Sequence, residues 1–125
     1  LGTCTNGRIS DFRAALDILD GRQLCPDFQL LVVPASRKIY VEMAENRMLA
    51  RFAELGAIIL PPSCGPCCGS SSGTPSDGVN VISTANRNFI GRMGNVKSNI
   101  YLASPATVAA SAITGKITDP REVFA

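Results

Sequence analysis

The sequence contains no histidine and no tryptophan, and aromatic residues make up only 6% of its 125 residues. Histidine is the side chain that most often transfers protons near neutral pH, so a complete acid–base active site would have to borrow groups from outside this sequence. The scarce aromatic residues offer no platform on which nucleic-acid bases could stack. With a formal net charge of only +2 and no run of five basic residues, the sequence predicts no nucleic-acid partner.

Long apolar segments are also missing. The longest apolar runs are far too short to cross a bilayer, and no charged segment followed by an apolar one indicates a signal peptide. The five cysteines are an odd number, whereas disulfide frameworks of secreted proteins usually have an even number. We therefore expect no membrane association and a reducing, cytoplasmic location. Because Leu1 already lies inside a motif, we also expect a piece of a longer protein.

What the sequence does contain is enough apolar material for a folded core. Hydrophobic residues make up 46% and charged residues 18%, which suits a single domain over residues 1–125. Apolar spacing, serine caps and terminating glycines predict helices over Ser10–Leu19, Arg37–Leu55 and Ser104–Thr114. Short apolar runs predict buried strands over Leu30–Val33, Ala57–Leu60, Val79–Ser83 and Ile100–Ala103.

The order of these elements predicts the fold class. Short buried strands that alternate with amphipathic helices indicate an α/β fold, a three-layer sandwich with a largely parallel sheet flanked by helices. The tail Lys116–Ala125 is predicted to be a linker or a terminal strand. In a parallel sheet the functional site lies beyond the carboxyl ends of the strands, so the loops after the second and third strands are the candidate positions.

Cysteines occupy one of these loops and a turn near the start of the chain. Cys4 lies in the string G-T-C-T-N-G-R, and Cys64 and Cys67 lie in S-C-G-P-C-C-G. A lone cysteine followed by a distant C-x-x-C suggests three thiolates on one metal cluster. On a cubane of four irons, three thiolates would leave one iron without a protein ligand, which would be an open Lewis-acid position.

The C-x-x-C pair has other interpretations. The string C-G-P-C is also the dithiol motif of thioredoxin-like oxidoreductases, although the Gly/Ser-rich segment that follows is a poor helix interior. Zinc would need a fourth donor, and the sequence has neither a histidine nor a second C-x-x-C; plain packing remains open. We expect Cys25 to be a packing residue, and Cys68, which adjoins Cys67, not to be a ligand.

An Asn/Arg segment follows the third predicted strand. Arg87 and Arg92 lie in a Gly/Asn-rich stretch with Asn86 and Asn88, and an arginine fork can bind a carboxylate with two hydrogen bonds. The alternative is that both arginines are solvated surface charges and both asparagines are turn formers. Arg8 and Arg37 are weaker candidates of the same kind.

Taken together, these segments resemble the aconitase superfamily, and within it the large subunits of 3-isopropylmalate dehydratase and homoaconitase. The strings that carry the resemblance are G-T-C-T-N-G-R at 2–8, S-C-G-P-C-C-G at 63–69, S-T-A-N-R-N-F-I-G-R-M-G at 83–94, Y-L-A-S-P-A-T-V-A-A-S at 101–111 and G-K-I-T-D-P-R at 115–121. They span nearly the whole chain in the family's order. Ser63 and Cys68 depart from the family's pattern, but neither departure removes a ligand.

The resemblance implies that the chain is the third, cluster-carrying domain of such a subunit. It implies that Cys4, Cys64 and Cys67 hold a [4Fe–4S] cluster, and that Asn86, Arg87 and Arg92 face the cluster and the substrate. The implied reaction is the isomerisation of a hydroxy di- or tricarboxylic acid by dehydration and rehydration.

The implied catalytic residues lie elsewhere. The family's histidines belong to the other domains of the large subunit, and its serine base belongs to a swivelling domain on a separate small subunit. We therefore expect no catalytic residue in this chain and no activity of the chain alone. The rival interpretations are homoaconitase or aconitase activity, a thiol–disulfide oxidoreductase using Cys64 and Cys67, and a non-catalytic RNA-binding module.

Overall fold

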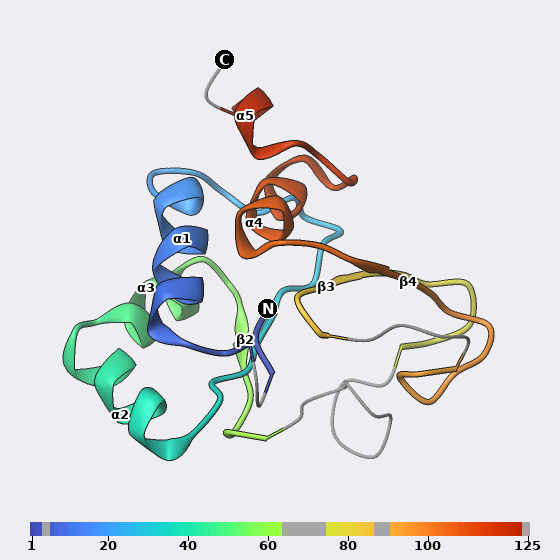
Figure 1. Cartoon of the computed structure of the whole chain (residues 1–125). Coiled ribbons are helices and arrows are strands. Elements are labelled where there is room, and N and C mark those ends of the chain that lie inside the picture. The colour runs from blue at the N-terminus through green and yellow to red at the C-terminus, as the bar shows by residue number, and fades with distance from the viewer. Residues whose placement is uncertain (4–5, 64–74, 87–90, 124–125) are drawn as a thin grey trace.

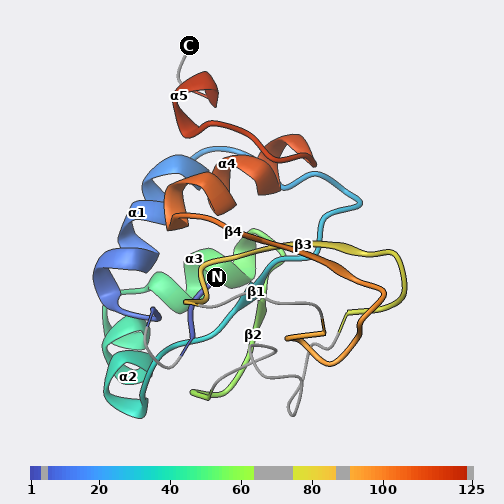
Figure 2. The same cartoon turned by 45° about the vertical axis from the view of Figure 1, so that its right-hand side comes forward.

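A computed structural model describes residues 1–3, 6–63, 75–86 and 91–123 (Figure 1). Its helices are α1 (Ile9–Leu19), α2 (Arg37–Glu45), α3 (Met48–Glu54), α4 (Pro105–Thr114) and α5 (Pro120–Val123), and its strands are β1 (Leu31–Val32), β2 (Ile58–Ile59), β3 (Asn80–Ser83) and β4 (Asn99–Leu102). In both views α1, α2 and α3 gather on one side, and β3 and β4 extend to the other (Figures 1 and 2). None of the helices in this part of the chain is long and apolar enough to cross a membrane.

The apolar core lies between α1, α3 and α4. Phe12 on α1 and Phe52 on α3 are both fully buried, and their rings meet edge to face with centroids 6.0 Å apart. Val108 on α4 is buried in the same cluster. The apolar spacing that predicted α1 therefore corresponds to the face that the fold buries.

The strands pair in parallel, as the α/β prediction requires. β1 pairs with β2, with Leu31 beside Ile58, and β3 pairs with β4, with Val81 beside Ile100. Among the described residues these pairs form two separate two-stranded sheets, whereas the sequence pattern indicated one largely parallel sheet. The α/β class is confirmed, and the sheet is divided.

The first residues of the chain lie in the division between the two sheets. The Leu1 amino group donates to Leu31 O at 2.9 Å, and Val33 N–H donates to Leu1 O at 2.9 Å. On the other side, Gly2 N–H donates to the Thr84 hydroxyl at 2.8 Å, just beyond β3. The segment that contains the first predicted motif thus connects the ends of β1 and β3.

Local start and stop signals determine the best-predicted helix. Ser104 Oγ accepts a hydrogen bond from Thr107 N–H at 3.2 Å, proline occupies the first helical position, and Gly115 ends α4 in the left-handed conformation with φ 82°. Ser36 caps α2 in the same way, through Ile39 N–H at 3.3 Å. These contacts are the side-chain and glycine caps expected from the sequence.

Three local predictions were wrong. The predicted helix over Arg37–Leu55 is two helices, because Arg47 adopts a left-handed φ of 66° and Asn46 Oδ1 accepts from Met48 N–H at 3.2 Å. An asparagine side chain that bonds nearby backbone competes with the helical hydrogen bonds. On α2 the fold buries Met43 and leaves Ala44 exposed.

The other two errors concern helix ends. The N-cap of α1 is Arg8 and not Ser10, because Arg8 N–H donates to the Asp11 carboxylate at 3.1 Å. The tail, predicted to be a linker or a terminal strand, contains a short helix instead over residues 120–123, which form α5. Asp119 precedes this turn and accepts from Arg121 N–H at 2.9 Å, and Pro120 suits a first helical position.

Candidate functional site

The six residues predicted for the site are only partly described. Asn86 and Arg92 belong to the described residues, whereas Cys4, Cys64, Cys67 and Arg87 lie outside them. The site is therefore built from the segments that flank those positions, namely 1–3 and 6–8, 61–63, 84–86, and 91–95.

Two glycines allow the first motif to pack closely against the backbone that follows β1. Gly2 has φ 91°, and a Cβ atom there would meet Val33 O and the Phe12 ring. A Cβ on Gly7 would lie 2.5 Å from Val33 O and 2.7 Å from Ala35 N, and Ala35 N–H donates to Gly7 O at 3.0 Å. Both glycines are needed because the backbone on either side of Cys4 approaches another backbone too closely for a side chain.

Asn6 joins the first motif to the Asn/Arg segment. Its side-chain NH₂ group donates to Thr84 O and to Asn86 Oδ1, the latter at 2.6 Å. The Asn6 backbone N–H donates to the Thr3 hydroxyl at 3.1 Å, and Thr3 and Thr84 are both buried. Residues about 80 positions apart in sequence therefore meet at one place, with Asn86 exposed beside it.

The second motif begins at the same edge. Leu60 N–H donates to Val32 O at 2.9 Å, which continues the parallel pairing of β2 with β1. The chain then runs through Pro61 to Ser63, directly before Cys64, and the Ser63 hydroxyl donates to Pro61 O at 3.1 Å. β1, β2 and the Leu1 segment are parallel neighbours. The second motif, which begins at Ser63, therefore starts at the edge of the strands where the first motif meets the Asn/Arg segment.

Arg92 lies in a turn that a buried neighbour and a backbone hydrogen bond hold in place. It is half-buried with a buried Nε atom, and its neighbour Met93 is only 2% exposed. Gly94 N–H donates to Gly91 O at 2.9 Å and closes the turn. Arg8 and Arg37, the weaker candidates, are exposed at the starts of α1 and α2.

Asn95 ties this turn to the end of the cysteine loop. Its NH₂ group donates to Pro75 O at 3.0 Å and to Asp77 Oδ1 at 2.9 Å, and its own Oδ1 accepts from Lys97 N–H at 2.9 Å. Lys97 also forms an ion pair with Asp77, with N and O 3.7 Å apart. Sequence reasoning missed both Asn6 and Asn95, because an asparagine in a Gly-rich string indicates a turn and not a long-range contact.

Cys25 has the packing role predicted for it. Its N–H donates to Ala112 O at 2.8 Å, and its sulfur would lie only 2.7 Å from a Cβ atom placed on Gly115. Within the described part of the chain no group of three His, Cys, Asp or Glu residues could hold a metal, and Cys25 is the one cysteine in that part.

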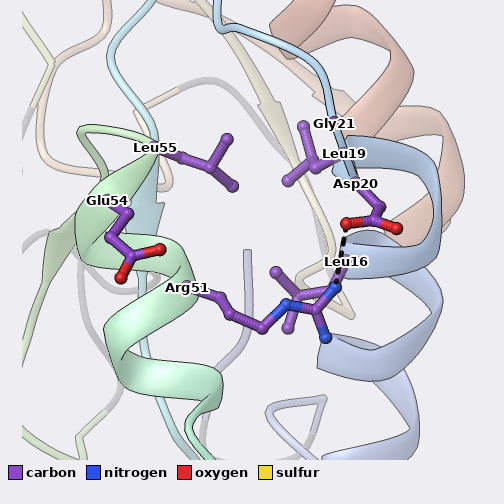
Figure 3. A pocket seen from close by; sticks show the side chains of 7 residues that line it. All are labelled: Leu16, Leu19, Asp20, Gly21, Arg51, Glu54 and Leu55. Atoms are coloured by element: carbon purple, nitrogen blue, oxygen red, sulfur yellow. Dashed lines mark ion pairs between the residues drawn. The ribbon is translucent and has the colours of Figure 1, made fainter.

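A small pocket lies at the opposite end of α1 from this edge (Figure 3). The Arg51 guanidinium faces Asp20 across it, with Nη2 and Oδ1 3.7 Å apart. Leu16, Leu19 and Leu55 also line it. Since α1 begins beside Gly7 and ends at Leu19, the pocket is not part of the candidate site.

The chain is similar to known proteins of one family. The family model for the aconitase family (aconitate hydratase) matches residues 1–115. The chain is 56% identical to 3-isopropylmalate dehydratase large subunit 1 of Thermotoga maritima over 121 residues, which are 97% of this chain and 29% of that protein. It is 52% identical to large subunit 2 of Archaeoglobus fulgidus over 122 residues, and 50% identical to large subunit 1 of Methanopyrus kandleri over 121 residues.

Those two alignments cover 98% and 97% of this chain and 29% of each relative. The chain thus spans less than a third of the length of these curated relatives. The family match, in contrast, extends over most of the chain. It includes both cysteine motifs and the Asn/Arg segment. The chain belongs to the aconitase family.

Proposed function

We propose that this chain is the third, cluster-carrying domain of the large subunit of an isopropylmalate dehydratase, a hydro-lyase that acts on a hydroxy di- or tricarboxylic acid. The observation that carries the proposal is the double hydrogen bond of Asn6 to Thr84 O and to Asn86 Oδ1, which holds the flank of Cys4 against the Asn/Arg segment. The names and identities of the relatives support the isopropylmalate substrate over the citrate or homocitrate alternatives.

The donor set fits a [4Fe–4S] cluster. Cys4, Cys64 and Cys67 would supply three thiolates, which are the usual protein ligands of iron–sulfur clusters. The described residues that flank Cys4, and Ser63 directly before Cys64, lie just beyond the carboxyl ends of the strands. When bound, the cluster supplies a Lewis-acidic iron that makes the hydroxyl of the substrate a better leaving group.

The chain's own residues bind and orient the substrate. Arg87 and Arg92 would hold a substrate carboxylate through two-pronged, charge-assisted hydrogen bonds. Asn86 would donate a hydrogen bond on the same side. Without histidine, this chain cannot supply the proton transfer in the usual way, so the base and acid would come from the other large-subunit domains and from a separate small subunit. The complete enzyme would be cytoplasmic and would need neither nucleic acid nor membrane.

The thiol–disulfide alternative has less support. It would use Cys64 and Cys67 and leave Cys4 without a role, and it does not follow from the family match. Insulin reduction by the purified chain would favour it.

The test uses the assembled large and small subunits. Arg92→Ala should weaken substrate binding about ten- to a hundredfold, because a charge-assisted hydrogen bond contributes on the order of 1.5–3 kcal/mol. Arg92→Lys should recover only part of the loss, because lysine keeps the charge and lacks the fork. Steady-state kinetics give KM and kcat, and the absorption spectrum reports the cluster, which should be unchanged.

The matched control is Arg37→Ala, which removes an exposed arginine at the start of α2. It should leave KM and kcat as in the wild type. Wild-type kinetics in both Arg87→Ala and Arg92→Ala would make these residues surface charges. Turnover by the 125-residue chain without a small subunit would contradict the assignment as a domain of a larger enzyme.

A further inference from the structure

We propose that Asn6 is a positioning residue that fixes the orientation of the Asn86 side-chain amide, so that Asn86 presents its NH₂ group and not its oxygen to the cluster and substrate. The inference rests on the proposed function, in which Asn86 faces these groups. It concerns a residue to which the proposed function gives no chemical role.

The orientation follows from a backbone carbonyl. Thr84 O can only accept a hydrogen bond, so the part of Asn6 that contacts it must be the NH₂ group. That same NH₂ group reaches Asn86 at 2.6 Å, and a donor there requires the oxygen of Asn86 opposite it. If either amide were turned around, two acceptors or two donors would face each other. The Thr84 carbonyl therefore orients the Asn6 amide, and the Asn6 NH₂ group in turn requires the oxygen of Asn86 opposite it.

The two threonines that contact Asn6 are themselves buried and hydrogen-bonded. Thr84 is 5% exposed, and its hydroxyl accepts from Gly2 N–H at 2.8 Å. Thr3 is 4% exposed, and its hydroxyl accepts from the Asn6 backbone N–H at 3.1 Å. Asn86, in contrast, is exposed in a bend. The terminal torsion of an asparagine has broad, nearly two-fold preferences, so the torsion by itself does not select one orientation of the amide.

The orientation matters because of the charge of the groups that Asn86 would face. Cluster sulfides and substrate carboxylates accept hydrogen bonds and carry negative charge. With its oxygen toward Asn6, the other polar group of the Asn86 amide is its NH₂, which is a donor. With the opposite orientation, its oxygen would repel the same groups. Asn6 thereby determines whether Asn86 attracts or repels an anion.

The test compares Asn6→Asp, Asn6→Ala and Asn86→Ala in the assembled enzyme. An aspartate at position 6 cannot donate, so Asn86 would turn its NH₂ group toward it and its oxygen toward the site. We expect Asn6→Asp to raise KM about tenfold or more. Asn6→Ala, which only releases the amide, should have a smaller effect. If Asn6→Asp does not fold, Asn6→Ala is measured in its place.

A second readout does not depend on turnover. Hydrogen bonds to cluster sulfurs affect the reduction potential of the cluster. Replacing a donor by an oxygen should therefore shift the potential to lower values in Asn6→Asp. Asn99→Asp is the matched control, because Asn99 makes one exposed side-chain hydrogen bond on β4, to Asn80 Oδ1 at 3.0 Å. It should change neither the potential nor KM.

The double mutants decide between positioning and a merely structural role. If Asn6 acts through Asn86, adding Asn6→Asp or Asn6→Ala to Asn86→Ala should cause no further change in KM or potential. Effects that add in the double mutants would overturn the inference. A normal KM and potential in Asn86→Ala would overturn it together with the role given to Asn86. An effect of Asn86→Ala without one of Asn6→Asp would overturn the inference alone.

Discussion

The helical side of the molecule and the edge that carries the motifs are held together by different forces. On the helical side, apolar side chains such as Phe12, Leu16 and Phe52 are at most 1% exposed. On the side of β3 and β4, Tyr101 and Leu102 remain 45% and 43% exposed. Several of the side-chain contacts there are hydrogen bonds of asparagines.

The difference follows from what each side has to do. Burial of apolar surface is strong but has no direction, so it stabilises a fold without fixing single atoms. A hydrogen bond contributes less, but it fixes a distance and an orientation. An asparagine amide can donate and accept at once, which suits it to join two loops. Hydrogen bonds thus fix the positions of side chains at the edge with the motifs, whereas apolar burial stabilises the helical side.

The largest effect is expected in the apolar core. Phe12→Ala should lower the free energy of unfolding by about 3–5 kcal/mol, because it removes a fully buried ring that packs edge to face on Phe52. Leu102→Ala on β4 is the control and should cost much less, because that side chain is 43% exposed. Denaturant unfolding measures both. Equal losses would remove the distinction between the two sides.

A substitution at Gly2 tests how tightly the helical side packs against the edge that carries the motifs. Gly2→Ala adds a Cβ against Val33 O and the Phe12 ring, at a φ of 91°. Gly56 has the same φ of 91° with nothing within 4 Å, so Gly56→Ala should cost only the backbone strain, about 1 kcal/mol. Overpacking should add about 1–3 kcal/mol at Gly2. Similar thermal shifts for the two variants would show that Gly2 is not crowded.

Asn95 tests the polar side alone. Asn95→Ala removes side-chain bonds to Pro75 O, Asp77 and Lys97 N–H, each of which contributes on the order of 1 kcal/mol. We expect faster amide exchange at Gly78, whose N–H donates to Lys97 O, with the core amides of α1 unchanged. If exchange rises equally in α1, the two sides unfold as one unit.

The smallest effect is expected at an exposed ion pair near the C-terminus. Hydrogen bonds from Arg121 lower the pKa of Asp119 from its ordinary 3.8 to about 2. The pair therefore contributes stability above pH 4 that is lost as the pH falls toward 2. In Arg121→Ala the pKa of Asp119 should return toward 3.8 in an NMR titration. Because both groups are solvent-exposed, the melting temperature at pH 7 should hardly change.

The sequence predicted those features that depend on nearby residues. Ser104, Pro105 and Gly115 determine α4 through caps and backbone preferences that act within one turn. The apolar stripe of α1 likewise predicted its buried face. The break at Asn46 and Arg47 was missed because one asparagine side chain overrode an otherwise helical pattern.

The candidate site depends on contacts that no local pattern reveals. Asn6 reaches Thr84 and Asn86, and Asn95 reaches Pro75 and Asp77. These contacts form only when distant segments fold together. The roles of Cys4, Cys64, Cys67 and Arg87 stay predictions, because these residues lie outside the described part of the chain.

The central claim is that the first and second motifs bind one cluster at the edge of the strands. The most direct test is the iron content and the EPR spectrum of the anaerobically reconstituted large subunit, compared between Cys4→Ser and Cys25→Ser. Cys25 is the matched control, because its sulfur packs against Gly115. We predict that the wild type and Cys25→Ser carry a [4Fe–4S] cluster and that Cys4→Ser loses it. An unchanged cluster in Cys4→Ser, or its loss in Cys25→Ser, would contradict the account.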